Sequence, residues 1–288
     1  MKAIQRVGVI GAGTMGNGIA QTCAVAGIEA VMLDVQDAAV QRGLKTIGGS
    51  LERLLKKEKI STADRDAAMA RITATTDYAA LASCDLIIEA ATENLELKLK
   101  ILRQVDALAR DDAVIASNTS SISITTLASV VTRPAEFIGV HFFNPVPMMA
   151  LVELVRGLQT SQDTVDLAIA FAQKLTKTPI VVKDSPGFVV NRILCPMLNE
   201  AVFALQEGLA TAADIDNGMK LGCGHPIGPL ALIDMIGLDV LLAVMNVFHT
   251  DFGDPKYRPP QLLKQMVAAG QLGRKTGRGF YDYTQEKK

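Results

Sequence analysis

A histidine and a glutamate near the middle of the chain could form an acid–base pair. His141 ends the run FIGVH and is one of three histidines, and Glu153 follows in the apolar run ALVELV. An imidazole, with an ordinary pKa of about 6.5, can exchange a proton with a hydroxyl group at neutral pH. A carboxylate in an apolar run is costly unless it is paired, and His141 could be its partner. A core histidine beside an edge-strand glutamate would give the same pattern.

A glycine-rich turn near the N-terminus predicts a dinucleotide site. Gly11, Gly13 and Gly16 have G-x-G-x-x-G spacing in GVIGAGTMG, between an expected strand and an expected helix. Gly11 permits the tight turn, Gly13 lets the backbone approach a pyrophosphate, and Gly16 lets helix and strand pack closely. The N-terminus of the helix then offers free N–H groups to the phosphates.

Asp34, at the end of the second expected strand, indicates which dinucleotide is bound. A carboxylate there can accept hydrogen bonds from an adenosine ribose and would repel a 2′-phosphate. Val35 and Gln36 follow it, so no arginine comes directly after the acid. The sequence therefore predicts NAD rather than NADP. The alternative is a glycine-rich turn with a surface aspartate.

Strands that alternate with helices are expected to position these groups. Short apolar and β-branched runs predict strands at RVGVI, EAVMLD, DLIIEA, AVIAS, FIGVHF, ALVELV and TPIVVK. Helical periods lie between the earlier strands, at 14–26, at 38–59, in a second helix ending at 71, and at 95–109. This order predicts an α/β fold with a Rossmann-type, mostly parallel sheet that has helices on both faces.

The pattern changes at DSPG, residues 184–187. Ser185 could cap a helix with Pro186 at its first position. Only helical periods follow, with helices expected at 188–206, 212–220, 229–252 and 260–268. We therefore expect an NAD-binding Rossmann domain at 1–184 and an all-helical domain for substrate binding and dimerisation at 185–288.

Composition excludes several classes of protein. The net charge is −1, so no basic excess predicts nucleic-acid binding. The cysteines, none in a C-x-x-C pair, fit a reduced intracellular protein; they are Cys23, Cys84, Cys195 and Cys223. A strand is expected within a few residues of the N-terminus, which predicts no signal peptide. We expect a cytoplasmic protein.

The apolar stretch at 235–248 is too short for a membrane span. Asp239 and Asn246 interrupt it, and a span needs about 18 uninterrupted apolar residues. The apolar residues at 233–248 exceed what one helix face buries in a small domain, which predicts a homodimer interface. Cys223 and His225 lie close together but have no further ligands beside them, so no metal site is predicted.

Four longer stretches resemble the L-3-hydroxyacyl-CoA dehydrogenase family. They are HFFNPVPMMALVELVRG, SPGFVVNRIL, GCGHPIGPLALIDMIGLD and GRKTGRGFYDY, and the similarity runs from the first strand to Tyr283. The resemblance implies two domains, dimerisation through the helical domain, and NAD as cofactor. It also implies oxidoreduction of short-chain 3-hydroxyacyl-CoA thioesters, such as 3-hydroxybutyryl-CoA and its partner acetoacetyl-CoA, a step used in fatty-acid and butanoate metabolism.

The resemblance also implies roles for particular residues. His141 would be the acid–base group and Glu153 its partner in a catalytic dyad. Ser120 in SNTSSI would hydrogen-bond the 3-oxygen of the substrate and lie at the cofactor, and Asn191 in FVVNR would reach the same oxygen. The other implied cofactor-site residues are Glu93, Lys98, Asn144 and Lys275. From spacing alone, Ser120 could equally cap a helix, and Asn191 could be a polar residue one turn into one.

The helix expected at 38–59 could hold the coenzyme A nucleotide. Ser50, Leu54 and Lys57 share one face at helical spacing. Phosphates bind cations and hydrogen-bond donors, and the resemblance implies CoA contacts at Ser50 and Lys57. The alternative is a solvated, charged helix end.

Two other functions share this scaffold. A 3-hydroxyacid dehydrogenase of the 3-hydroxyisobutyrate type has the same order of domains, but that family uses a catalytic lysine where this chain has Asn191. A non-enzymatic cofactor-binding protein would have no need of the set Ser120, His141, Glu153 and Asn191. The residues thus favour dehydrogenation of a 3-hydroxyacyl-CoA over both alternatives.

Overall fold

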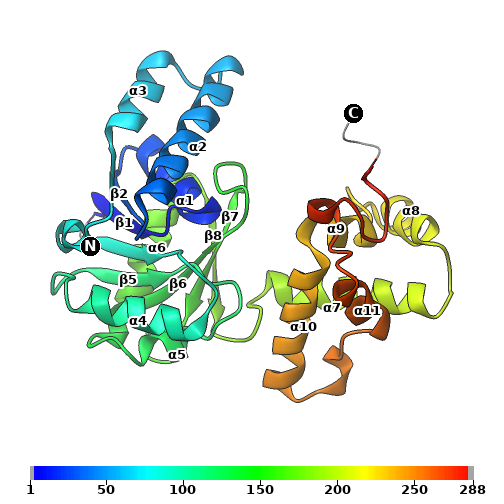
Figure 1. Cartoon of the computed structure of the whole chain (residues 1–288). Coiled ribbons are helices and arrows are strands. Elements are labelled where there is room, and N and C mark those ends of the chain that lie inside the picture. The colour runs from blue at the N-terminus through cyan, green and yellow to red at the C-terminus, as the bar shows by residue number, and fades with distance from the viewer. Residues whose placement is uncertain (1–2, 285–288) are drawn as a thin grey trace. The chain divides into compact units, whose positions relative to one another are not determined.

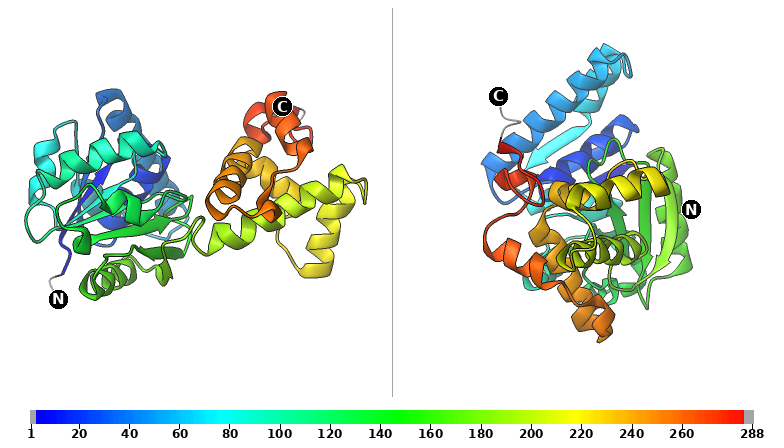
Figure 2. Two further views of the ribbon diagram at one scale, coloured as in Figure 1. Left: turned by 90° about the horizontal axis from the view of Figure 1, so that it is seen from below. Right: turned by 90° about the vertical axis from the view of Figure 1, so that its right-hand side faces the viewer.

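The computed structural model describes residues 3–284 and divides the chain into two compact units. The first unit ends at Phe188 and the second begins at Val189, whereas the change of sequence pattern places the boundary after 184. Residues 185–188 stay with the first unit because Phe188 packs into its hydrophobic core. Figures 1 and 2 show the first unit as a sheet with helices on both faces and the second as helices alone.

An eight-stranded sheet is the centre of the first unit, with strand order β3-β2-β1-β4-β5-β6-β7-β8. The strands are β1 (Arg6–Ile10), β2 (Glu29–Leu33), β3 (Ile72–Thr75), β4 (Leu86–Glu89), β5 (Val114–Ser117), β6 (Phe137–Phe142), β7 (Leu151–Arg156) and β8 (Thr178–Lys183). Neighbouring strands are parallel except for β6 and β7, which are antiparallel. The predicted α/β class with a mostly parallel sheet is confirmed.

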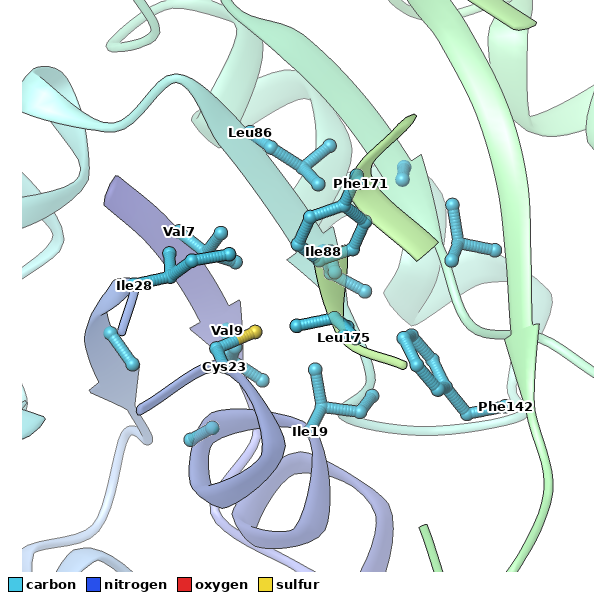
Figure 3. Close-up of a cluster of buried hydrophobic side chains, with 14 of the residues drawn as sticks. Val7, Val9, Ile19, Cys23, Ile28, Leu86, Ile88, Phe142, Phe171 and Leu175 are labelled. Carbon is cyan, nitrogen blue, oxygen red and sulfur yellow. The ribbon is translucent and has the colours of Figure 1, made fainter. Parts of the chain in front are cut away.

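Helices cover both faces of the sheet, which explains why most strands are apolar along their whole length. The helices of the first unit are α1 (Thr14–Val25), α2 (Asp37–Lys56), α3 (Thr62–Ala70), α4 (Leu95–Asp106), α5 (Ile124–Ala128) and α6 (Gln162–Lys174). One core cluster joins the sheet to α1, α2 and α6, and a second joins it to α4 and α5. Figure 3 shows side chains of the first cluster, including Ile19 and Cys23 of α1 with Val7 and Val9 of β1.

The second unit consists of helices around its own core. They are α7 (Val190–Gln206), α8 (Ala212–Cys223), α9 (Pro229–Ile236), α10 (Leu238–Phe252) and α11 (Gln261–Ala268). The single helix expected at 229–252 is wrong, because the chain breaks at Gly237, where φ is +112°. Within residues 3–284 no single helix is long and apolar enough to cross a membrane; α9 and α10 reach that only as a pair, bent by 97°.

The expected cap at Ser185 is also wrong. Helix α7 starts at Val190, and its N-cap, Val189, makes no side-chain capping bond. The carbonyl of Ser185 instead accepts a hydrogen bond from the N–H of Phe188 over 2.9 Å, which closes a turn. Because of this turn, the helix begins two residues later than the expected start at 188.

Candidate active site

His141 and Glu153 are brought together by the register of the two antiparallel strands. They are directly opposite each other on β6 and β7, so their side chains share one face of the sheet. Nδ1 of His141 lies 2.7 Å from Oε2 of Glu153. Glu153 is fully buried and His141 nearly so. An ionised carboxylate only accepts hydrogen bonds, so it holds the ring proton on Nδ1 and leaves the lone pair of Nε2 for another proton.

A buried asparagine, not identified from the sequence, holds the end of the strand that bears His141. The side-chain oxygen of Asn118 accepts a hydrogen bond from the backbone N–H of Phe142 over 2.9 Å. Asn118 follows directly after β5, so this bond joins the ends of two neighbouring strands. Its place within SNTSSI, directly after an apolar strand, was the available signal.

Ser120 and Glu93 are joined by hydrogen bonds between the loops after β5 and β4. Oε1 of Glu93 accepts from the N–H and from the hydroxyl of Ser120, at 2.9 and 3.2 Å. Oε2 accepts from the hydroxyl of Thr119 at 2.7 Å. The carboxyl ends of parallel strands meet at one edge of the sheet, so two positions distant in sequence become neighbours.

Lys98 lies beneath these loops, with its side chain only 1% exposed. Its ammonium is 2.5 Å from Oε2 of Glu89, the last residue of β4. The Ser117 hydroxyl donates to the same oxygen over 2.9 Å, and Oε1 accepts from the N–H of Ala91. Lys98 therefore supports the two loops from within rather than presenting its charge at an open surface. Glu89 was not singled out from the sequence, although an acid ending the strand DLIIEA was visible.

The glycine-rich turn lies in the crevice between β1 and β4, where the order of strands reverses. Gly11 has φ +100°, and a Cβ there would lie 2.7 Å from the carbonyl oxygen of Ala90. A Cβ on Gly16 would overlap the carbonyl oxygen of Gly11. A Cβ on Gly13 would meet nothing within 4 Å, so this position faces open space. These three placements fit a bound dinucleotide.

Two pockets, of about 440 and 470 Å³, share Gly11, Asp34 and Ala91. The first has mainly apolar walls, including Leu33, Tyr78, Leu97 and Ile101, which suit an adenine ring. The second is more polar than the first, and its lining includes Gly13, Thr14, Asn17, Arg42 and Thr46. The arrangement can hold a nucleoside in one pocket and its phosphates in the other.

Asp34 is fixed where the two pockets meet. Its Oδ2 accepts from the N–H of Ala12 at 2.9 Å and its Oδ1 from the N–H of Gln36 at 3.2 Å. Burial, then the nearby carboxylates of Asp34 and Glu89, raise the pKa of Tyr78, so its hydroxyl stays protonated at neutral pH. Arg42, on α2, lines the second pocket together with Asp34 and was not singled out from the sequence.

The remaining expected site residues are divided between the two units. Asn144 is exposed in the loop between β6 and β7. Asn191 is half-buried in the first turn of α7, in the second unit. Lys275, also in the second unit, pairs with Asp239, with Nζ 2.5 and 2.7 Å from the two carboxylate oxygens.

The expected CoA face of α2 is only partly free. Leu54 packs against the core, whereas Ser50 is half-buried and Lys57 is exposed at the C-cap of the helix. Ser50 and Lys57 therefore remain available for polar contacts, whereas Leu54 is partly used by the core.

Comparison with known proteins places both units in one family. Residues 6–185 match the family described as 3-hydroxyacyl-CoA dehydrogenase, NAD binding domain, and residues 187–283 match its C-terminal domain. The chain is 50% identical over 280 residues to the 3-hydroxybutyryl-CoA dehydrogenase of Bradyrhizobium diazoefficiens, covering 97% of this chain and 96% of the relative.

Similar structures and more distant relatives agree with this. The crystal structure of (S)-3-hydroxybutyryl-CoA dehydrogenase from Ralstonia eutropha has a TM-score of 0.96 and 63% identity, covering 98% of this chain and 100% of that one. The mitochondrial hydroxyacyl-coenzyme A dehydrogenase of Rattus norvegicus is 42% identical, covering 97% of this chain and 91% of the relative.

Proposed function

The chain belongs to the 3-hydroxyacyl-CoA dehydrogenase family and is an NAD-dependent dehydrogenase, and from this premise we propose that it interconverts (S)-3-hydroxybutyryl-CoA and acetoacetyl-CoA. The observation that carries the proposal is the pairing of His141 Nδ1 with Glu153 over 2.7 Å in a nearly dry site. Nothing else in the described residues combines a titratable ring nitrogen, an orienting carboxylate and this degree of burial.

In the oxidative direction Nε2 of His141 takes the proton of the 3-hydroxyl group, while the C3–H bond breaks and a C3=O bond forms. Bound NAD supplies the acceptor for the hydride, and in the reverse direction NADH supplies the donor. His141 returns its proton to the 3-oxygen during reduction, so one group serves both directions. Glu153 keeps the ring in one tautomer and stabilises its charged form.

Donors at the 3-oxygen complete the proposed reaction. Ser120 and Asn191 would hydrogen-bond that oxygen without being consumed. Glu93 supports the role of Ser120, because it fixes both the backbone and the hydroxyl of that residue. Asn144 and Lys275 would complete the cofactor site, while Ser50 and Lys57 would contact the CoA phosphates.

We propose that the protein works as a homodimer formed by the second unit. Many apolar residues at 233–248 are used inside this unit, yet Met235, Ile236 and Val240 remain 54%, 38% and 44% exposed. A groove of about 480 Å³, lined by apolar residues of α7 and α8, adds to the surface that a second copy could cover. Sedimentation that shows a folded, active monomer at micromolar concentration would contradict the dimer.

The decisive test of the function is NADH absorbance at neutral pH with acetoacetyl-CoA. The expected result is NADH oxidation that depends on the thioester and is largely lost in a His141→Gln variant. A parallel assay uses 3-hydroxyisobutyrate with NAD. Activity on 3-hydroxyisobutyrate, with none on acetoacetyl-CoA, would assign the chain to the 3-hydroxyisobutyrate type of dehydrogenase. No turnover in either assay would contradict the proposed substrate class.

A further inference from the structure

The last residue of the first unit, Phe188, has its side chain against the imidazole of His141. Its ring centroid lies 5.6 Å from that of His141, with the rings nearly edge to face. Phe143 contacts the same imidazole, with a centroid distance of 4.5 Å. His141 therefore touches two aromatic rings as well as Glu153. Edge-to-face contacts of this kind favour particular ring orientations.

The backbone around Phe188 is unusual for a bulky residue. Its φ is +52°, and φ of the preceding Gly187 is +76°. A large side chain with positive φ strains the backbone and persists only where the surroundings impose it. Phe188 is only 4% exposed and belongs to the core cluster that contains Val155, Ile124 and Val182. The surroundings thus hold this ring in place despite the backbone strain.

The start of the same segment is tied to the start of α5. The carboxylate of Asp184 accepts hydrogen bonds from the N–H groups of Ile124 and Thr125, at 3.0 and 2.8 Å. It also accepts from the hydroxyl of Ser123 at 2.7 Å. Residues 184–188 are therefore fastened to the first unit at both ends, and Phe188 cannot move without disturbing one of these attachments.

We propose that Phe188 is a positioning residue for His141. With Phe143, its ring holds the imidazole in the orientation in which Nδ1 faces Glu153, and it screens that hydrogen bond from water. A hydrogen bond to a carboxylate is stronger in a dry, low-dielectric site. Because Val189 begins the second unit, Phe188 is also the residue through which that unit is covalently joined to the site. The inference rests on the proposed function, which assigns acid–base catalysis to His141.

The test compares Phe188→Ala and Phe188→Leu with the matched variants Phe171→Ala and Phe171→Leu. Phe171, on α6, is equally buried in the other core cluster of the same unit and makes no ring contact with His141. We expect Phe188→Ala to lower kcat by roughly 10–100-fold, since small misplacements of catalytic groups have effects of this size, with KM for NADH unchanged. Phe188→Leu, which keeps apolar bulk, should recover part of the loss, and neither Phe171 variant should show it.

Nuclear magnetic resonance gives a readout that does not depend on turnover. The chain has three histidines, so ¹⁵N-labelled histidine gives few signals, and His225→Gln and His249→Gln variants assign the remaining one to His141. In the unmodified protein the Nδ1 proton should be visible because it is bonded to Glu153 and shielded. In Phe188→Ala it should broaden or vanish through exchange with water, while Phe171→Ala should leave it unchanged.

The outcomes separate the two proposals. A folded Phe188→Ala variant with the original kcat and the original Nδ1 proton signal overturns the positioning role, as does an equal change in Phe171→Ala. If Phe188→Ala does not fold, the same comparison is made with the leucine variants. An unmodified protein that does not oxidise NADH with acetoacetyl-CoA contradicts the proposed function instead, and the proton signal then still decides whether Phe188 holds the imidazole.

Discussion

The carboxylate of Glu89 and the ammonium of Lys98 lie 2.5 Å apart, with the two side chains 0% and 1% exposed. The pair joins the end of β4 to the first turns of α4 and, through Ser117, to the end of β5. Two charges this deeply buried require each other, because either one alone would be left without water or a counter-charge.

Removal of one partner should therefore destabilise the first unit severely. Lys98→Met should lower the free energy of unfolding by about 3–5 kcal/mol, because the buried carboxylate of Glu89 loses its counter-charge. The double variant Glu89→Gln/Lys98→Met should recover much of that loss. Urea unfolding of the three proteins measures both effects, with the exposed Lys100→Met as the control. A Lys98→Met variant as stable as the control would mean that the pair contributes nothing.

The dyad should behave as one unit in kinetics. His141→Gln should lower kcat by roughly 10²–10⁴-fold, the usual contribution of general acid–base catalysis, while NADH still binds. Glu153→Gln should also lower kcat sharply, since an amide can leave the imidazole in the wrong tautomer. With His141 already replaced, loss of Glu153 should cost little more. The measurement is a double-mutant cycle on kcat with acetoacetyl-CoA and NADH; losses that simply multiply would assign Glu153 a separate role.

Asp34 should decide between NAD and NADP. Asp34→Asn should raise kcat/KM for NADPH by roughly tenfold or more, because a unit charge about 4 Å from a phosphate is worth about 1–4 kcal/mol. Arg42 already lines the same pocket and is available to the 2′-phosphate once the carboxylate is gone. Asp37→Asn, which lines neither pocket, is the matched control. An unmodified enzyme that prefers NADPH would contradict the role given to Asp34.

Lys57 should contribute only to binding of the nucleotide part of CoA. Lys57→Ala should raise KM for acetoacetyl-CoA by about tenfold, since a hydrogen bond to a charged group is worth about 1.5–3 kcal/mol, and should leave KM for NADH unchanged. Lys59→Ala, a neighbouring exposed lysine, should change neither constant. S-acetoacetyl-pantetheine, which lacks the nucleotide, should bind the unmodified and Lys57→Ala proteins equally. If the variant weakens both thioesters alike, Lys57 does not contact the nucleotide.

Asp85 should make the free energy of unfolding depend on pH in the acid range. Burial raises the pKa of its carboxyl, but hydrogen bonds from the N–H groups of Gln5 and Arg6, together with Arg110, hold the pKa below its ordinary value of 3.8. A depressed pKa in the folded state gives a stabilisation that is present above the unfolded value and is lost as pH falls through the folded one. Asp85→Asn should thus be less stable than the parent at pH 7, and the two should converge well below pH 3.8. Unfolding curves across this range measure the effect; a difference independent of pH would assign it to hydrogen bonding alone.

The glycine-rich turn and the acid after the second strand could be located from sequence because their chemistry is local. Gly11 needs its positive φ within one turn, and Asp34 reaches Ala12 simply because β1 and β2 pair in parallel. Most strands of the first unit were likewise visible as apolar runs. The four-residue edge strand β3 was not, since its alternating, half-exposed side chains resemble a loop.

Tertiary structure decided everything that depends on how segments distant in sequence meet. The apolar run at 229–252 gives no sign that the helix breaks at Gly237, where φ is positive. At the end of the first unit, a turn from Ser185 to Phe188 stands where a helix was expected to start. Lys98 matches a cofactor-site position in sequence, yet folding encloses it against Glu89.

Sequence by itself determined the fold class, the family resemblance, and the candidate residues His141 and Glu153. The register of β6 against β7 decided that these two side chains face each other, and the packing of Phe188 decided what surrounds the imidazole. The physical reason is that residue type and local spacing fix backbone preferences and chemical capacity. Which side chains share a buried space depends instead on strand pairing and close packing across the whole unit.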